Sequence, residues 1–479
     1  MRKTKIVATL GPASEDPEVL RAMIEAGLDV ARFNFSHGDH ESHLKLATVL
    51  RNIAESMGKT VALLADTKGP EIRVGEFQGG SAELIAGSMF TLTSNNVMGN
   101  ATQCSVSYTD LPRDVKPGST ILLDDGMIEL VVESVSGANI ACRVVSGGLI
   151  YDRKGVNVPD VSLDFPYISS KDRSDLRFIV ENKFDIIAAS FVRSADDVAQ
   201  IREELGRVDS KNKIRIISKI ENAEGVRNAE SILAASDGLM VARGDLGVEV
   251  AYEDLPIIQK ELIDKAVIQG KCVITATQML ESMIVNPRPT RAEVSDVANA
   301  IYDGTGAIML SGETAAGKYP AESIATMAKI AQRIERDIDY RSRFSRKDYN
   351  PETSITNAIS HATVTTAHEL NTAAILTITM SGNTARNVAK YRPSCPIIAC
   401  TPDPASQRQL NLVWGVVPLL TREETDTSIL FSQAVDVALE SGLIKEGDLV
   451  VLTGGVPVGS SGTTNMLKVH VVGEEIFVS

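Results

Sequence analysis

The chain has 479 residues, of which 43% are hydrophobic and 23% charged, a composition typical of a globular protein with several domains. Its formal net charge is −14, which disfavours non-specific binding to nucleic acids or anionic membranes. The five cysteines are scattered and form no CxxC pair, so we expect reduced thiols and a cytoplasmic protein. We expect no signal peptide in the segment MRKTK, and no apolar run approaches the roughly 18 residues of a membrane span.

The first part of the chain alternates short apolar strands with helices. The predicted elements, strand and helix in turn, cover residues 5–10, 17–26, 30–36, 41–57 and 61–67. From about residue 76 to 150 the helical pattern stops, and short runs of Val, Ile, Leu and Thr alternate with turns rich in Gly, Asn, Asp and Pro. This second pattern is typical of a small all-β domain.

The alternation of strands and helices resumes after residue 169. Further strands are predicted at about 185–191, 214–221, 238–245, 272–277 and 306–312. Together with the first three, they make eight units, which predict an α/β fold of the (β/α)8 TIM barrel type with a small β-barrel domain inserted after strand 3. A doubly wound open sheet is the structural alternative. Polar residues at one end of nearly every strand favour the barrel, whose sites lie at that end.

The last part of the chain predicts a third domain. A charged segment at 336–350 is interpreted as a surface linker, and a helix near 355–370 then precedes five short apolar strands. This is an α/β pattern. We place the barrel, the inserted β domain and the C-terminal α/β domain at residues 1–69 with 168–345, 70–167, and 346–479.

The fifth barrel strand ends in a lysine and a carboxylate. In the sequence IRIISKIE at 214–221, side chains alternate between the two faces, so Lys219 and Glu221 point the same way. A charged pair at the end of a buried strand requires a partner, a metal or a ligand. A structural salt bridge is the alternative.

Polar residues also end the other strands. They are Arg32, Asn34, Ser36, Asp66, Thr67, Arg243, Gly244, Asp245, Thr277, Ser311 and Glu313. Glu221 and Asp245 come from neighbouring strands and are carboxylates of the kind that hold Mg²⁺ together with substrate oxygens and water. Since phosphoryl transfer needs a metal and well-placed cations, we predict a metal-assisted site for a small phosphorylated anion. Ion pairs that only stabilise the barrel remain the alternative.

Several motifs closely resemble those of the pyruvate kinase family, in the same order and nearly from end to end. They are ARFNFSHG at 31–38, DTKGPEIR at 66–73, KGVNVP at 154–159, IISKIENAEGV at 216–226, MVARGDLGVE at 240–249 and TATQMLESMIVNPRPTRAEVSDVANAI at 275–301. The resemblance, to the three-domain bacterial type, implies phosphoryl transfer from phosphoenolpyruvate to ADP, giving pyruvate and ATP in the final step of glycolysis. It also implies Mg²⁺ or Mn²⁺ and K⁺ as cofactors, and a homotetramer.

The resemblance assigns roles to residues by position. The phosphoenolpyruvate contacts would be Arg32, Gly244, Asp245 and Thr277. Glu221 and Asp245 would hold Mg²⁺, and Lys219 would stabilise charge on the phosphoryl group. The enolate proton would arrive through a relay of hydroxyls and water near Thr277, which the resemblance extends to Ser311 and Glu313.

Nucleotide and potassium sites also follow from the resemblance. The nucleotide contacts would be Asn34, Phe35, Ser36, His37, Arg73 and Lys154. The K⁺ ligands would be Asn34, Ser36, Asp66 and Thr67. Potassium-independent members carry a lysine where this chain has Glu71, so the acid supports K⁺ dependence. The inserted domain, with hinges at Pro70 and near Pro159, would close over the barrel as a lid that excludes water.

The sequence TMSGNT at 379–384 follows a strand and opens a helix near Ala385. Hydroxyls and N–H groups at a helix start suit a phosphate, and a turn with a helix cap is the alternative. The resemblance predicts an allosteric site with contacts at Thr379, Ser381, Gly382, Asn383 and Thr384. Between Thr421 and Asp448 the chain lacks the tryptophan that some fructose-bisphosphate-activated members use. A phosphorylated sugar with one phosphate or a nucleotide monophosphate is therefore at least as suitable an effector.

Two other functions are left open by the sequence. Another Mg²⁺-dependent barrel enzyme acting on phosphoenolpyruvate or an enolate, such as an aldolase or a lyase, would have no use for Arg73 and Lys154. A sugar-phosphate sensor without activity would be expected to lack Lys219, Glu221 or Asp245, and all three are present.

Overall fold

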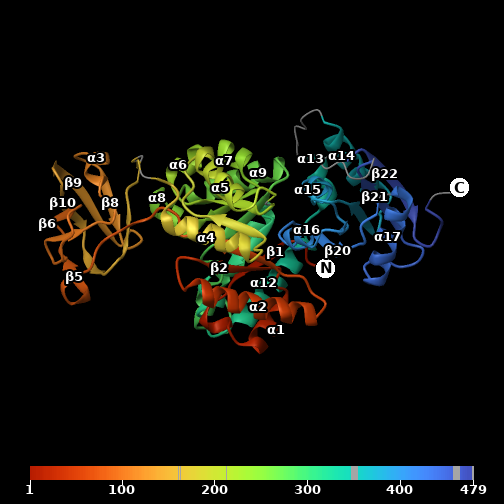
Figure 1. The fold of residues 1–479 in the computed structure, drawn as a ribbon, viewed down its shortest axis with the longest axis horizontal. Coiled ribbons are helices and arrows are strands. Elements are labelled where there is room, and N and C mark those ends of the chain that lie inside the picture. Colours follow the sequence, from red (N-terminus) through yellow and green to blue (C-terminus); the bar gives the residue numbers. More distant parts are fainter. Residues whose placement is uncertain are drawn as a thin grey trace.

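The protein is described by a computed structural model, which covers residues 1–159, 161, 163–164, 166–211, 213–346, 354–424, 426–456 and 464–476. Three bodies follow one another along the long axis of the molecule (Figure 1). A β-rich body lies at one end, the barrel lies in the centre, and an α/β body lies at the other end. In the described part of the chain, no helix is both long and apolar enough to cross a membrane.

Eight parallel strands close the central barrel. They are β1 (Lys5–Thr9), β2 (Val30–Asn34), β3 (Ala62–Asp66), β13 (Ile186–Ala189), β14 (Arg215–Ile220), β15 (Gly238–Ala242), β16 (Cys272–Ala276) and β17 (Ala307–Leu310). β17 pairs with β1, with Ile308 opposite Ile6, and this pairing closes the ring. The strands are buried on both faces, because one face fills the barrel and the other packs against helices. The predicted barrel is therefore confirmed, and the open sheet is excluded.

Helices surround the barrel and connect its strands. The longer ones are α1 (Pro17–Ala26), α2 (His40–Ser56), α4 (Ser170–Glu181), α5 (Ala195–Val208), α9 (Leu255–Ile268), α10 (Arg291–Asp303) and α12 (Pro320–Glu335). Shorter helices are α6 (Ala223–Arg227), α7 (Ala229–Ala235), α8 (Arg243–Glu249) and α11 (Gly312–Ala315). Local sequence accounts for their ends. In α10, Thr290 and Glu293 form a capping box, and Gly304 ends the helix with φ +102°.

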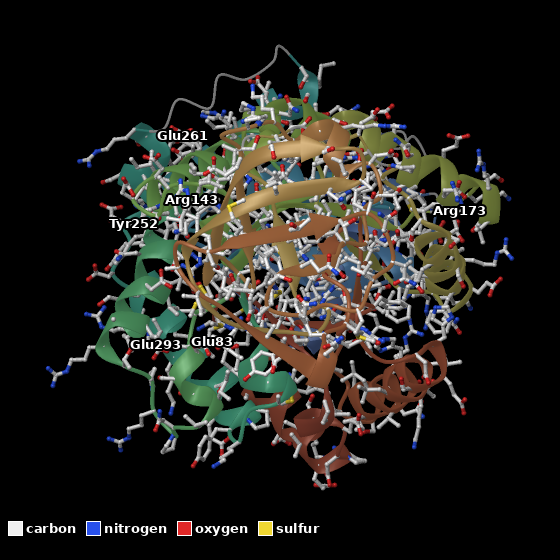
Figure 2. All side chains as sticks on the ribbon, turned by 90° about the vertical axis from the view of Figure 1, so that its left-hand side faces the viewer. Glu83, Arg143, Arg173, Tyr252, Glu261 and Glu293 are labelled. Atoms are coloured by element: carbon white, nitrogen blue, oxygen red, sulfur yellow. The ribbon has the colours of Figure 1, made fainter. Side chains whose placement is uncertain are left out.

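The body inserted between β3 and β13 is a curled β-sheet. Its sheet order is β4 (Ile72–Arg73), β12 (Gly155–Asn157), β8 (Thr120–Leu123), β9 (Ile128–Ser136), β10 (Asn139–Ser146), β6 (Met89–Thr93) and β7 (Gln103–Ser105). A further pair is β5 (Ser81–Leu84) with β11 (Gly148–Tyr151), and α3 (Leu111–Asp114) is a single turn. A bridge between Val74 and Val106 brings the first and last strands together, as the predicted small barrel requires. Figure 2 shows this body in front of the central barrel.

The C-terminal body is a sheet of five strands between helices. Its elements are α14 (Ile355–Glu369), β18 (Ala374–Ile378), α15 (Asn383–Ala389), β19 (Ile397–Thr401), α16 (Pro404–Leu410), β20 (Val416–Leu420), α17 (Thr427–Glu440), β21 (Leu449–Gly454) and β22 (Met466–Val471). The order is β20-β19-β18-β21-β22, with β22 antiparallel to β21.

The predicted linker at 336–350 is partly wrong. Tyr340–Arg346 form helix α13. Tyr340 is buried, its ring lies against Trp414, and Lys3 Nζ lies 4.0 Å from the ring centre. The aromatic side chain of Tyr340 packs against residues that are distant in the chain. This part of the charged segment is therefore a packed helix and not a surface linker. The predicted residues from 347 to 350 lie outside the described part of the chain.

Buried polar contacts join the C-terminal body to the end of the barrel opposite the insert. Asp185, whose side chain is 1% exposed, accepts hydrogen bonds from Leu63 N over 2.9 Å and from Arg408 Nε over 2.7 Å. Lys5 Nζ donates to Val416 O over 2.7 Å. Burial raises the pKa of Asp185, and Arg408 offsets only part of that shift.

We predict that Arg408→Ala lowers the free energy of unfolding by about 1.5–3 kcal/mol, because Asp185 then keeps a buried charge without its cation. Arg333→Ala is the control, since Arg333 is 69% exposed and its ion pair with Asp337 contributes less than about 1 kcal/mol. Denaturant unfolding at several pH values measures both. A carboxyl whose pKa is raised on folding binds its proton more tightly when folded, so the deficit of Arg408→Ala should shrink as the pH falls. A deficit no larger than that of the control would contradict the prediction.

Candidate functional site

Four charged side chains from three strands meet at the mouth of the barrel. Arg32 lies in β2 and Asp66 ends β3. Lys219 lies near the end of β14, and Glu221 directly follows that strand. Arg32 Nε lies 2.6 Å from Asp66 Oδ2, Lys219 Nζ lies 3.1 Å from Asp66 Oδ1, and Lys219 Nζ lies 2.9 Å from Glu221 Oε1. Each of these side chains is at most 11% exposed. We call this row of alternating charges the charge chain.

Neighbouring charges decide the ionisation of Asp66 and Lys219. Burial alone would raise the pKa of Asp66, but the cations of Arg32 and Lys219 outweigh it and lower that pKa. Burial alone would lower the pKa of Lys219, but Asp66 and Glu221 outweigh it and raise that pKa. Lys219 is therefore an ammonium group at neutral pH.

One carboxylate oxygen of Glu221 has an ion-pair partner but no hydrogen bond among the described residues. Oε2 accepts a hydrogen bond from Phe191 N over 2.6 Å. Oε1 is buried and has no hydrogen bond within the described residues, since Lys219 Nζ is close to it but outside hydrogen-bonding geometry. Burial raises the pKa of Glu221 to about 7, with a further contribution from the charge of Asp245. A cation between Glu221 and Asp245 would remove this penalty.

The ends of β15 and β16 form a polar corner beside the charge chain. Gly244 N donates to Thr277 Oγ1 over 2.8 Å, and Thr277 Oγ1 donates to Ala276 O over 2.6 Å. Ser311 Oγ, at the end of β17, is buried without a hydrogen bond in the described part of the protein.

The carboxylate of Glu313 holds backbone groups on two neighbouring loops. It is fully buried and accepts hydrogen bonds from Leu280 N over 3.0 Å and from Ser311 N over 2.7 Å. Both oxygens therefore bind the backbone.

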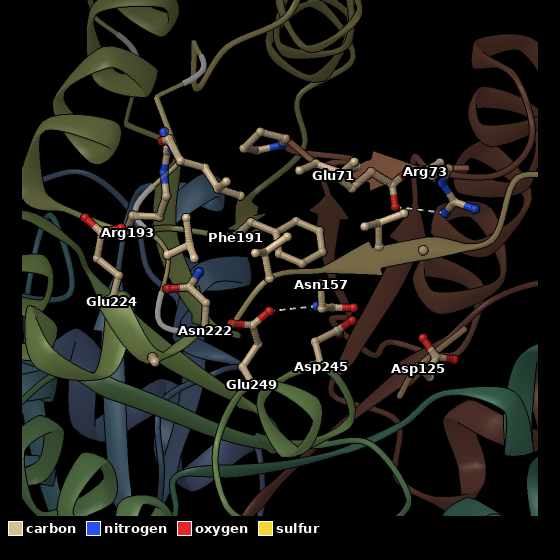
Figure 3. Close-up of a pocket in the computed structure, with 18 of the residues that line it drawn as sticks. Glu71, Arg73, Asp125, Asn157, Phe191, Arg193, Asn222, Glu224, Asp245 and Glu249 are labelled. Atoms are coloured by element: carbon tan, nitrogen blue, oxygen red, sulfur yellow. Dashed lines mark hydrogen bonds and ion pairs between the residues drawn. The ribbon is translucent and has the colours of Figure 1, made fainter. Parts of the chain in front are cut away.

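A cleft of about 270 Å³ separates the inserted domain from the barrel mouth (Figure 3). Its lining includes Arg73, Asp124, Asp125, Lys154, Asn157, Phe191, Asp245 and Glu249. Arg73 Nε and Nη2 donate hydrogen bonds to the two carboxylate oxygens of Glu71, over 2.7 and 2.8 Å. Asn157 Nδ2 donates to Glu249 Oε1 over 2.9 Å, which joins the inserted domain to α8. The cleft therefore places Arg73 and Lys154 on one wall and Asp245 on the other.

Comparison with known proteins identifies the family. The family profile "Pyruvate kinase, barrel domain" matches residues 1–324, and the profile "Pyruvate kinase, alpha/beta domain" matches residues 357–470. The chain is 50% identical to a pyruvate kinase of Clostridium acetobutylicum over 473 residues, 98% of this chain and 100% of the relative. The chain belongs to the pyruvate kinase family.

Two further pyruvate kinases agree. One from Geobacillus stearothermophilus is 52% identical over 475 residues, 99% of this chain and 81% of the relative. A crystal structure of a pyruvate kinase from Cryptosporidium parvum matches with a TM-score of 0.93 at 41% identity, over 98% of this chain and 96% of that one. The predicted family and its enzyme class, pyruvate kinase, are confirmed. The alternatives of an aldolase, a lyase or an inactive sensor are set aside.

The structure adds two residues to this pyruvate kinase site that sequence reasoning missed. Arg32 Nη1 donates to Thr9 Oγ1 over 2.8 Å, at the end of β1. Lys219 Nζ donates to Ser190 Oγ over 2.8 Å, and Ser190 Oγ lies 3.0 Å from Asp66 Oδ1. Thr9 and Ser190 stand at the ends of β1 and β13, the two barrel strands from which sequence analysis took no candidate residue. Their position at a strand end is the signal in the sequence that could have identified them.

The four predicted K⁺ ligands lie on two neighbouring strand ends. Asn34 is the last residue of β2, and its Oδ1 accepts a hydrogen bond from Ser36 N over 3.1 Å. Thr67 follows Asp66 beyond β3, and its carbonyl oxygen accepts from Ser190 Oγ over 2.6 Å. β2 and β3 pair with Asn34 opposite Asp66, so the two halves are adjacent.

Gly69, where the chain leaves the barrel for the inserted domain, provides a test of the packing around Lys219. Its φ is +64°, and a Cβ atom there would lie 2.8 Å from the carbonyl oxygen of Ser190. Gly58 has φ +60° and nothing within 4 Å of its Cβ position, so it is the matched control. We predict that Gly58→Ala costs about 1–2 kcal/mol of stability through backbone strain alone.

Gly69→Ala should cost about 1–3 kcal/mol more, because the Ser190 backbone must move. It should also lower the rate of pyruvate formation, since Ser190 contacts Lys219. Thermal unfolding and the activity assay measure both variants. Equal effects of the two substitutions would contradict the prediction.

Proposed function

We propose that the barrel mouth catalyses Mg²⁺- and K⁺-dependent transfer of the phosphoryl group from phosphoenolpyruvate to ADP, giving pyruvate and ATP as the final step of glycolysis. The observation that carries the proposal is the charge chain beside Asp245. It supplies two permanent cations and two carboxylates next to Asp245, which lines a cleft whose other wall carries Arg73 and Lys154. The acidic net charge of the chain makes such local cations necessary for binding anions.

Phosphoenolpyruvate would bind between Arg32 and the start of α8. The described partners of Arg32 engage its Nε and Nη1, which leaves Nη2 to face the substrate phosphate. The substrate carboxylate would bind at the backbone N–H groups of Gly244 and Asp245, beside the hydroxyl of Thr277. Gly244 N now donates to that hydroxyl, so the carboxylate would take over this hydrogen bond.

The donor set fits a divalent metal. Glu221 Oε1 is a buried oxygen without a hydrogen bond in the described residues. Burial raises the pKa of Glu221, and the charges of Asp245 and Asp66 add to this shift. We propose that Glu221 and Asp245 hold Mg²⁺, or Mn²⁺ in its place. When bound, such a metal stabilises negative charge on the phosphoryl and enolate oxygens.

Lys219 would stabilise the phosphoryl group during transfer. Its raised pKa keeps it charged, so it acts as a fixed cation and not as a proton donor. The enolate proton would arrive through Thr277, Ser311 and water. The hydroxyl of Ser311 suits this role because it is buried without a hydrogen bond in the described structure. Glu313 would position the loops, since both of its oxygens hold backbone N–H groups.

ADP would bind across the cleft. Arg73 and Lys154 of the inserted domain would contact its phosphates, and the segment 34–37 would line the other side. Lys171 Nζ supports that segment by donating to Phe35 O over 3.0 Å. K⁺ would bind next to it, through Asn34, Ser36, Asp66 and Thr67. Closure of the inserted domain over the barrel would exclude water from the phosphoryl group.

A phosphorylated sugar or a nucleotide monophosphate would act as an allosteric activator at the loop before α15, through Thr379, Ser381, Gly382, Asn383 and Thr384. Arg386 supports this loop by donating to Ser381 O over 2.7 Å. The helix begins at Asn383, two residues earlier than predicted. We further propose a cytoplasmic homotetramer with the domain boundaries 1–69 with 168–345, 70–167 and 346–479.

The direct test is pyruvate formation from phosphoenolpyruvate and ADP by the full-length chain. The assay is run with both ions, with Mg²⁺ alone, with K⁺ alone, and with neither. Full activity is expected only with both ions. No pyruvate with both ions present would overturn the proposed reaction, and full activity without K⁺ would overturn the proposed K⁺ dependence alone.

We predict that Lys219→Met lowers kcat by about 100- to 1,000-fold, because a cation that stabilises the transferring group is lost. Binding of phosphoenolpyruvate in the presence of Mg²⁺ should change little, since Arg32 and the backbone of α8 remain. Lys59→Met removes an exposed lysine and is the control. Steady-state kinetics and calorimetric binding are the measurements. Equal losses in binding and in turnover would count against the proposed role.

We predict that Glu71→Lys reduces the ratio of activity with K⁺ to activity without it, since an ammonium group beside the site replaces the missing cation. Glu71 also forms two hydrogen bonds with Arg73. Glu71→Gln is therefore the control, because it weakens the contact with Arg73 without adding a positive charge. Rates at matched ionic strength with K⁺ or a tetraalkylammonium salt give the ratio. A ratio equal to that of Glu71→Gln would refute this interpretation of residue 71.

A further inference from the structure

Thr277 has a backbone conformation that threonine rarely adopts. Its φ is +69°, and the next residue, Gln278, is also left-handed, with φ +55°. A β-branched residue in this region is strained, so the surrounding structure must hold it there. In this conformation the hydroxyl of Thr277 accepts the hydrogen bond from Gly244 N over 2.8 Å.

The guanidinium group of Arg243 holds both peptide groups that flank the Cα atom of Thr277. Nε donates to Ala276 O over 3.2 Å, and Nη2 donates to Thr277 O over 2.6 Å. One planar group therefore fixes the peptides on both sides of the strained residue through two donors in a rigid fork, a geometry that an ammonium group lacks. Because Arg243 directly precedes Gly244, the same side chain fastens the end of β16 to the start of α8.

Helices outside the barrel orient Arg243 in turn. Nη1 donates to Asp296 Oδ1 of α10 over 2.7 Å, and it lies 3.5 Å from Gln259 Oε1 of α9. The side chain of Arg243 is 10% exposed and that of Asp296 is 35% exposed. Asp296 and Gln259 line a groove of about 540 Å³ on the outer surface between these helices. The ion pair thus connects this surface to Thr277.

We propose that Arg243 is a positioning residue for the phosphoenolpyruvate site and that Asp296 sets its orientation. The inference rests on the proposed function, in which Gly244, Asp245 and Thr277 bind phosphoenolpyruvate. Arg243 does not touch the substrate. It holds Thr277 and Gly244 in the geometry that binds the substrate carboxylate. Because the proposed ADP contacts lie on the inserted domain and beyond β2, ADP binding does not depend on Arg243.

The test is Arg243→Lys. This substitution keeps the positive charge opposite Asp296 but removes the pair of guanidinium hydrogen bonds to Ala276 O and Thr277 O. The KM for phosphoenolpyruvate should rise about ten- to hundredfold, while the KM for ADP and the thermal unfolding midpoint stay close to those of the wild type. Calorimetric titration with phosphoenolpyruvate and Mg²⁺, without ADP, should show the same loss of affinity.

Arg202→Lys is the matched control. Arg202 also bonds a backbone carbonyl and an aspartate, with Ala235 O at 2.9 Å and Asp237 Oδ2 at 3.0 Å, but at the opposite end of β15. Its kinetics should equal those of the wild type. Asp296→Asn should give a smaller rise in the KM for phosphoenolpyruvate. The double variant Arg243→Lys/Asp296→Asn should be no worse than Arg243→Lys, because the two residues act through one contact.

Two results would overturn the inference. One is a KM for phosphoenolpyruvate within about twofold of the wild-type value in Arg243→Lys. The other is an equal rise in both KM values together with a lower unfolding midpoint, which indicates a general structural role. Pyruvate formation by the wild type separately tests the proposed function. A wild type that binds phosphoenolpyruvate but forms no pyruvate would contradict the proposed reaction, and the calorimetric affinity ratio would still decide the role of Arg243.

Discussion

The charge chain at the barrel mouth is the interaction on which the rest of the site depends. Arg32, Asp66, Lys219 and Glu221 are nearly excluded from solvent, and each charge is compensated by the next. Removal of one member of such a buried set leaves its partner as an uncompensated charge, at a cost of about 3–5 kcal/mol. At the end of the chain, Glu221 Oε1 has no hydrogen bond within the described residues, and Asp245 adds a third carboxylate beside the two cations. The set of charges is therefore one cation short of full compensation. That deficit is what makes the site suited to a metal.

The two bodies attached to the barrel are joined to it in different ways. The C-terminal body is joined by buried polar contacts such as Asp185 with Arg408, which are costly to break. The inserted domain meets the barrel across a cleft, with the partly buried contact between Asn157 and Glu249. A domain held by contacts of this second kind moves at low cost. This difference suits the proposed role of the inserted domain as a lid, and it suits a C-terminal body that stays fixed against the barrel.

Strand β14 links the two ends of the barrel. Its first residue, Arg215, donates to Ser381 O in the proposed effector loop over 3.1 Å and pairs with Asp237 over 2.9 Å. Its other end carries Lys219 and Glu221. This strand pairs with a neighbour on each side, so one paired strand joins the proposed effector loop to the charge chain.

The eight strands, the inserted β domain and the set of polar strand ends could be predicted from the amino-acid sequence, because they follow from local periodicity and turn residues. The pairing of side chains could not be predicted in this way and depends on the three-dimensional fold. Ser190 and Thr9 join the site, Asp66 serves both Arg32 and Lys219, and Thr277 is held in a strained conformation. The three-dimensional fold also made a helix of part of the charged segment after residue 336. Such contacts join residues far apart in the chain, so they depend on strand register and barrel closure, which local patterns do not contain.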